Sequence, residues 1–127
     1  MQQISIRNGV IASAAALLLA AALPVNEAAA QADASCRQLF KIRSLNSSTK
    51  TQVTFINNSG MHRGIMWLDF TGHPKDYAGL NHGQRVMLNT FLTHPWMITT
   101  GPGDCLEIVQ PRPGSSVVTL RPRADKR

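Results

Sequence analysis

The chain has 127 residues and a formal net charge of +6, from 13 lysines and arginines against seven aspartates and glutamates. Its first thirty residues hold one basic and one acidic residue, and every aromatic residue, cysteine and histidine follows them. The remaining 97 residues are too few for a doubly wound nucleotide-binding fold or for a TIM barrel of roughly 250 residues. They suffice for one small sandwich or barrel.

Residues 1–30 are predicted to be a cleaved signal peptide. A basic start that includes Arg7 precedes an apolar run from Val10 to Leu23, and the small residues Ala28–Ala30 suit signal peptidase. The run has 14 residues, short of the ~20 that span a bilayer, so a retained anchor is the weaker alternative. No later run approaches that length. We therefore expect a periplasmic or secreted chain with no transmembrane segment after cleavage.

Two cysteines follow the predicted leader, Cys36 and Cys105. In an oxidising compartment, a pair of cysteines in a small domain usually forms a disulfide. This bond would close a loop of ~70 residues and stabilise the fold by roughly 4 kcal/mol in a chain-entropy estimate. The alternatives are two free buried thiols or a metal site, which the lack of a Cys-x-x-Cys spacing disfavours.

From residue 31 to residue 127 we expect one domain with a core at residues 39–120. Short alternating segments bounded by Gly, Pro and Asn are typical of an all-β sandwich or small barrel, and here they predict seven or eight strands. A basic tail at residues 121–127 is expected to be frayed. The predicted strands are Leu39–Arg43, Thr51–Asn57, Ile65–Phe70, a short piece near Asp76–Ala78, Arg85–Phe91, Trp96–Thr100, Leu106–Val109 and Val117–Leu120.

The stretch from Trp67 to Trp96 contains both tryptophans, the only tyrosine and His94. A sandwich this small needs large apolar residues in its core, so a core role is the plainer interpretation of Trp67. His94 precedes Pro95 and lies before a predicted strand, and a histidine in such a loop is most often solvated. Without further information, Trp67 would therefore be assigned to the core and His94 to the surface.

Other kinds of function find little support. The chain contains no Gly-x-Ser-x-Gly, no His-Glu-x-x-His and no pair of carboxylates in one short motif, so we expect no enzyme. Lysine and arginine are scattered outside the tail, which argues against nucleic acid as a partner. A His/Met set could suit copper, but no tight spacing gathers its members, and we expect neither a metal nor another cofactor. That set is Met61, His62, His73, His82 and Met97.

Residues 43–96 contain two distinctive motifs, preceded by Arg43-Ser44-Leu45-Asn46-Ser47, by Gln52-Val53 and by Phe55, Asn57 and Ser59. These motifs are Trp67-Leu68-Asp69-Phe70-x-Gly72-x-Pro74-x-x-Tyr77 and Thr90-x-x-x-His94-x-Trp96. This stretch resembles, without a gap, the β domain of the von Hippel–Lindau tumour suppressor family. The resemblance implies a seven-stranded β-sandwich that binds a hydroxylated proline within an extended peptide.

The resemblance also implies roles for single residues. Trp67, Tyr77 and Trp96 would form the aromatic walls around the proline ring. His94 falls on the histidine that meets the hydroxyl, and Thr90 stands where the family has a serine. A hydroxyl and an imidazole can discriminate for the hydroxylated ring, because an unhydroxylated ligand would leave both groups unpaired at roughly 1–3 kcal/mol each.

Two neighbours depart from the family pattern, since Asn89 replaces a histidine and Phe91 a tyrosine. Both flank the implied pocket and would affect peptide preference. Animal members continue into a helical domain that recruits ubiquitin-ligase components. Because no amphipathic helix follows Leu120, we expect no such partner. The sequence thus predicts a secreted, non-catalytic module that binds an extended proline or hydroxyproline peptide; the alternative is a structural or interaction sandwich without a working pocket.

Overall fold

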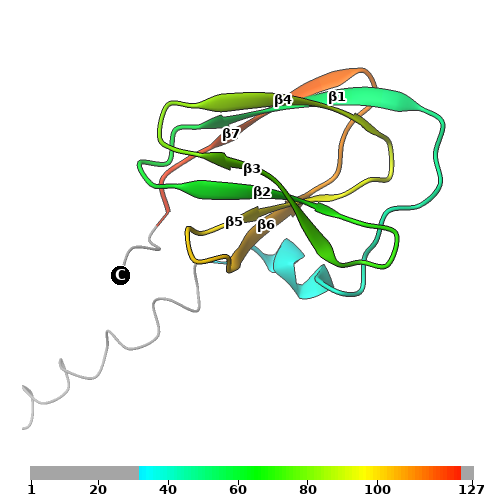
Figure 1. The fold of residues 1–127 in the computed structure, drawn as a ribbon, viewed down its shortest axis with the longest axis horizontal. Helices are drawn as coiled ribbons and strands as arrows, with labels where there is room; N and C mark the ends of the chain where they lie inside the picture. The colour runs from blue at the N-terminus through cyan, green and yellow to red at the C-terminus, as the bar shows by residue number, and fades with distance from the viewer. Residues whose placement is uncertain (1–31, 124–127) are drawn as a thin grey trace, which may run out of the picture. The chain divides into compact units, whose positions relative to one another are not determined.

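The computed structural model describes residues 32–123, so the predicted signal peptide and the last four residues of the basic tail lie outside the described residues. The described part is all-β apart from one short 3-10 helix, as predicted (Figure 1). It contains no helix that is both long and apolar enough to cross a membrane. The elements are η3 (Ala34–Gln38), β1 (Lys50–Asn57), β2 (Arg63–Leu68), β3 (Pro74–Leu80), β4 (Arg85–Phe91), β5 (Trp96–Thr99), β6 (Cys105–Val109) and β7 (Ser115–Leu120).

The seven strands form two sheets, with the order β4-β1-β7 in one and β3-β2-β5-β6 in the other (Figure 1). In the first sheet, β1 pairs with β4 antiparallel and with β7 parallel. In the second sheet all pairs are antiparallel, and the β2–β3 register shifts between Ile65 and Met66. The strands β3 and β4 are therefore edges, one of each sheet, and they contact each other.

Side chains that alternate along the strands fill the space between the sheets. In β1, Val53 and Phe55 are buried while the residues between them are partly exposed, and this period of two is what a half-buried strand requires. Burial of each large apolar side chain is worth about 1.5–3 kcal/mol. The buried cluster comprises Val53, Phe55, Ile65, Leu80, Trp96, Ile98 and Leu120.

The segment Leu39–Arg43 is not the strand that its apolar residues predict. Lys41 and Ile42 donate their backbone N–H groups to the carbonyl of Gln38, and Phe40 has a φ of 69°. A left-handed residue cannot continue a strand, so the chain turns here instead. The segment forms the end of an N-terminal arm, which we define as residues 33–42.

The N-terminal arm covers the outer edge of β6. Asp33 donates its backbone N–H to the carbonyl of Leu106 at 2.7 Å, and Ile108 donates its backbone N–H to Ser35 Oγ at 2.8 Å. The backbone N–H of Ser35 bonds the carboxylate of Asp33 and holds the pKa of that group below its usual value. A disulfide joins Cys36 to Cys105, which confirms the predicted bond.

Candidate functional site

The structure brings all five predicted ligand-binding residues to one pocket at the β3 and β4 edges. Its volume is about 270 Å³, slightly below the ~300–1,000 Å³ of pockets that take drug-sized ligands. It is therefore suited to a single side chain. We call it the aromatic pocket, and its lining residues are Trp67, Phe70, Tyr77, Asn89, Thr90, Phe91, His94 and Trp96.

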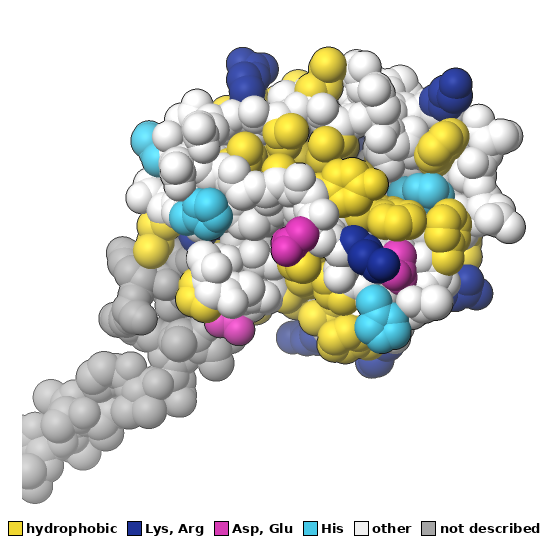
Figure 2. All heavy atoms as spheres, in the orientation of Figure 1, with side chains coloured by type: hydrophobic (Ala, Val, Ile, Leu, Met, Phe, Trp, Pro, Cys, Tyr) yellow, Lys and Arg dark blue, Asp and Glu magenta, His cyan; other side chains and the backbone are white. Residues whose placement is uncertain are grey.

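Aromatic rings of the pocket meet edge to face, the geometry that ring quadrupoles favour. The ring centroids of Tyr77 and Trp96 are 4.9 Å apart with an interplanar angle of 87°. Trp67 makes the same kind of contact with Phe70 at 5.5 Å and with Tyr77 at 6.4 Å. Tyr77 is 55% exposed and Phe70 is 46% exposed, so the walls reach the surface. Figure 2 shows hydrophobic side chains gathered on one face of the molecule beside charged and histidine side chains.

The two predicted polar residues are buried and held by hydrogen bonds. His94 Nε2 lies 3.1 Å from the carbonyl oxygen of Leu45. Because a carbonyl only accepts, Nε2 carries the hydrogen, and Nδ1 is then the acceptor nitrogen of the uncharged form of the ring. Trp96 Nε1 donates to Thr90 Oγ1 at 3.3 Å, which leaves the hydrogen of that hydroxyl available as a donor.

The backbone beside His94 is strained. Thr93 has a φ of 70°, which is rare for a β-branched residue. Two bonds with Leu45 oppose the strain: Leu45 donates its backbone N–H to the Thr93 carbonyl, and Thr93 Oγ1 donates to the Leu45 carbonyl at 3.1 Å. Strained residues persist where the surroundings over-determine them, and they often mark functional sites. Here Leu45 bonds both Thr93 and His94, so the strained residue and the pocket histidine are held by the same loop.

One polar atom of the pocket wall has no partner. Among the described residues, Trp67 Nε1 is the single buried side-chain nitrogen or oxygen without a hydrogen bond. Leaving such a donor unpaired costs roughly 1–3 kcal/mol, and each case in a folded protein calls for an explanation.

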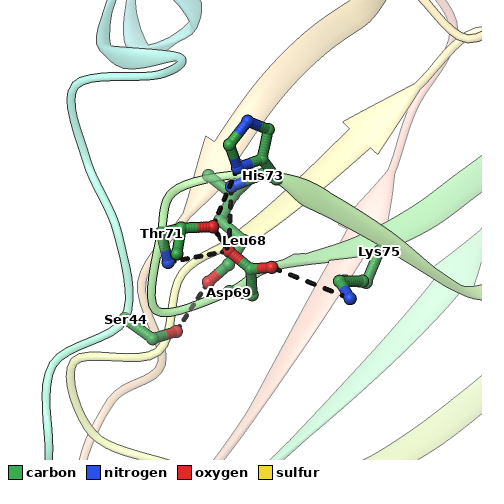
Figure 3. A network of polar contacts seen from close by, with 6 residues as sticks. All are labelled: Ser44, Leu68, Asp69, Thr71, His73 and Lys75. Atoms are coloured by element: carbon green, nitrogen blue, oxygen red, sulfur yellow. Dashed lines mark hydrogen bonds and ion pairs between the residues drawn. The ribbon is translucent and has the colours of Figure 1, made fainter.

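A turn between β2 and β3 supports the pocket from one side (Figure 3). Asp69 Oδ1 accepts the backbone N–H groups of Thr71 and His73 and the hydroxyl of Thr71, at 2.7–2.9 Å. These bonds, first among them that of the Thr71 hydroxyl, lower the pKa of Asp69 to about 2. Lys75 Nζ lies 3.9 Å from the same carboxylate.

Ser44 fastens this turn to the preceding loop, where its Oγ donates to the Leu68 carbonyl at 2.6 Å and its backbone N–H to the Asp69 carbonyl (Figure 3). Leu68 in turn donates its backbone N–H to the carbonyl of Pro95. The turn that carries Phe70 and the loop that carries His94 are therefore bonded to the same strand end. This network holds the two sides of the pocket in a fixed relation.

One sequence interpretation needs correction. His94 is 8% exposed, and the Leu45 carbonyl and surrounding rings replace the water expected around a loop histidine. Trp96 is 2% exposed and belongs to the buried cluster, and it also lines the aromatic pocket.

Sequence reasoning missed Phe70 and Leu45. Phe70 follows the end of β2, and its only signal in the sequence is an aromatic residue inside the first motif. Leu45 acts through its carbonyl, which no side-chain pattern reveals. Asn89 and Phe91 line the pocket as flanking residues. Asn89 also accepts a hydrogen bond from Gln52 Nε2 at 3.1 Å. The ring centroids of Phe91 and His94 are 5.4 Å apart.

The candidate copper ligands come from several segments: Met61 and His62 precede β2, His73 precedes β3, His82 precedes β4, and Met97 lies in β5. Within residues 32–123, no group of three or more His, Cys, Asp or Glu side chains lies close enough to hold a metal ion. Met97 is buried, and His62 and His82 bond Asn81 and the backbone of Gly60 instead.

Comparison with known families agrees with the geometry. The family model of the VHL beta domain matches residues 42–111, a range that runs from the end of the N-terminal arm past β6. The chain belongs to this family, whose β domain is a binding domain known for peptide recognition. No curated protein matches the chain.

Proposed function

We propose that the protein is a non-catalytic module that binds an extended peptide through a hydroxylated proline seated in the aromatic pocket. A proline ring is apolar and conformationally restricted, so aromatic walls can hold it with little loss of entropy. The small volume of the pocket and the exposed rings of Phe70 and Tyr77 support a ligand that enters from the surface.

The observation that carries the proposal is the polar pair inside these apolar walls. The Thr90 hydroxyl already accepts the Trp96 N–H, and His94 Nε2 is bonded to the Leu45 carbonyl. A ligand hydroxyl can therefore accept from Thr90 and donate to His94 Nδ1. One hydroxyl satisfies both groups, whereas unmodified proline satisfies neither and leaves them desolvated.

We further propose that the protein acts outside the cytosol. Disulfides persist in oxidising compartments, and the Cys36–Cys105 bond suits the export that the predicted leader would direct. The alternative function, a structural sandwich whose pocket binds nothing, predicts no saturable response to any proline peptide.

Tryptophan fluorescence tests the proposal, because Trp67 and Trp96 are the only tryptophans and both line the pocket. The probe is a short alanine-rich peptide with one central hydroxyproline, compared with its proline twin. Thr90→Val, which removes the hydroxyl at constant shape, should weaken hydroxyproline binding by roughly 10- to 100-fold. Thr90→Ser keeps the hydroxyl and should bind within a few-fold of the parent protein. Equal binding by both variants would contradict the assignment of Thr90.

A further inference from the structure

Four strands form the edges of the two sheets: β4 and β7 in one, β3 and β6 in the other. An edge strand presents backbone N–H and C=O groups without partners, a template on which another chain can pair. Folded proteins usually cover such edges or protect them with charges, proline or a bulge. The four edges of this sandwich differ in how they are protected.

Three of the edges carry such protection. The N-terminal arm covers β6 through the bonds of Asp33 and Ser35. The strand β3 begins at Pro74, carries the charges of Lys75 and Asp76, and pairs with β2 through a register shift. The strand β4 borders the aromatic pocket and begins with a charged residue, Arg85.

Within residues 32–123, the fourth edge, β7, has none of these devices. Its residues Ser115–Leu120 include no charge, no proline and no glycine, and within the described part of the chain its strand partner is β1 alone. Val117 is 63% exposed. An uncharged edge strand of this kind is open to pairing with another strand.

A groove of about 720 Å³ runs between β7 and β6. Its lining combines apolar and polar side chains: Ile108, Val109, Pro111, Val117 and Val118 lie beside Glu107, Gln110, Arg112 and Ser116. A strand added to β7 would place every second side chain into this groove, between the two sheets. The groove therefore favours an incoming strand whose apolar residues alternate.

The charges around β7 favour an acidic partner. Arg112 lies in the groove before β7 and Arg121 follows the strand; both are exposed, and neither has an ion-pair partner among residues 32–123. The carboxylate of the groove, Glu107, is bound by Arg123 at 3.0 Å. A second copy of the chain would bring its own charge of +6 and place like charges together, which is unfavourable.

We propose that β7 receives an extended acidic segment of a partner protein as an additional strand. Alternate apolar side chains of that segment enter the groove, and acidic residues at its ends face Arg112 and Arg121. Since β4 and β7 are opposite edges of the same sheet, this surface is separate from the aromatic pocket and its occupation does not depend on the proposed function.

The test uses the whole protein and a short synthetic peptide in which valine and threonine alternate between terminal aspartates. Amide NMR signals of Ser115–Leu120 should shift and gain protection from hydrogen exchange on binding. A twin peptide with terminal lysines should bind about tenfold more weakly. Two further peptides carry N-methyl groups on alternate backbone nitrogens, so that each has one of its two edges blocked. The peptide whose blocked edge faces β7 should not bind, and the peptide whose opposite edge is blocked should bind normally.

Variants assign the charges. Replacement of both Arg112→Glu and Arg121→Glu should reverse the preference in favour of the lysine peptide, whereas Arg85→Glu on β4 should not change it. All three arginines are exposed, so the fold should tolerate these changes. The pocket variant His94→Ala should bind the aspartate peptide like the parent protein.

Three results would overturn the proposal. These are equal binding of the two methylated peptides, shifts confined to strands other than β7, or a salt-strengthened dimer of the protein alone that protects the β7 amides.

Discussion

Trp67 and Trp96 line one pocket, but their indole N–H groups have different surroundings. Trp96 Nε1 bonds Thr90 and its ring lies in the buried cluster, whereas Trp67 Nε1 has no partner in the described chain. We predict that Trp96→Phe lowers the free energy of unfolding by about 2 kcal/mol, from a lost hydrogen bond and a core cavity. Trp67→Phe should cost under ~1 kcal/mol, because it also removes an unpaired donor.

Urea unfolding of the two variants measures this difference directly, and each variant serves as the other's control. An equal loss of stability in both would show that the Trp67 N–H has a partner, or that packing alone sets the cost.

At the residue scale, the sequence predicts which side chains line the pocket but not which hydrogen bonds they form. The residues His94 and Thr90 could be named because their motif resembles that of a known family. The direction of the bonds could not be predicted, since it depends on a carbonyl of Leu45 and on a strained Thr93. Main-chain partners from a loop about fifty residues earlier leave no mark in a side-chain pattern.

Among the elements, the β2–β3 turn depends on one carboxylate. Asp69 accepts three hydrogen bonds that favour its charged form, and they lower its pKa from the usual 3.8 to about 2. A carboxyl group whose pKa is lower in the folded state stabilises the fold above the unfolded pKa, and this contribution is lost as the pH falls toward the folded pKa. The hydrogen bonds of the Asp69 carboxylate should therefore stabilise the turn fully above pH 4, and this stabilisation should decrease between pH 4 and pH 2.

We predict that Asp69→Asn destabilises the protein by an amount that is constant above pH 4 and shrinks between pH 4 and pH 2. The measurement is the free energy of unfolding of both proteins across this range. Subtracting one curve from the other cancels the carboxyl groups they share, including Asp33. A gap that stays constant or widens in acid would contradict the assigned hydrogen bonds.

The seven strands of the described residues follow from the sequence, and their ends lie within two residues of the predicted bounds. Alternation places β4 at its predicted bounds and β1 within one residue of them. The prediction of a strand fails at Leu39–Arg43, where the apolar residues lie at the end of the N-terminal arm that covers the edge of β6. It also shortens β3, because Lys75, Asp76 and Tyr77 are all exposed and no alternation remains to be read.

For the whole molecule, the disulfide secures the N-terminal arm over β6 and links positions 69 residues apart. Replacing both Cys36 and Cys105 by serine should lower the free energy of unfolding by about 4 kcal/mol. The Ile108 amide should then exchange faster, because its acceptor, Ser35 Oγ, lies on the released arm. Ser35→Ala is the matched control, which removes the acceptor and retains the disulfide.

Unfolding in urea and hydrogen exchange measure the two effects separately. Unchanged stability together with unchanged exchange at Ile108 would mean that the arm holds to β6 without the bond. In that case the covered edge of β6 would be a property of the arm's own contacts.

The central claim is that the aromatic pocket distinguishes hydroxyproline from proline. Calorimetric titration of the parent protein with the hydroxyproline peptide and its proline twin tests it most directly. We predict a dissociation constant at least about tenfold lower for the hydroxylated peptide, since each buried group left unpaired by proline costs roughly 1–3 kcal/mol. In His94→Ala this ratio should fall toward one. Equal affinity of the parent protein for both peptides, or no heat with either, would contradict the account.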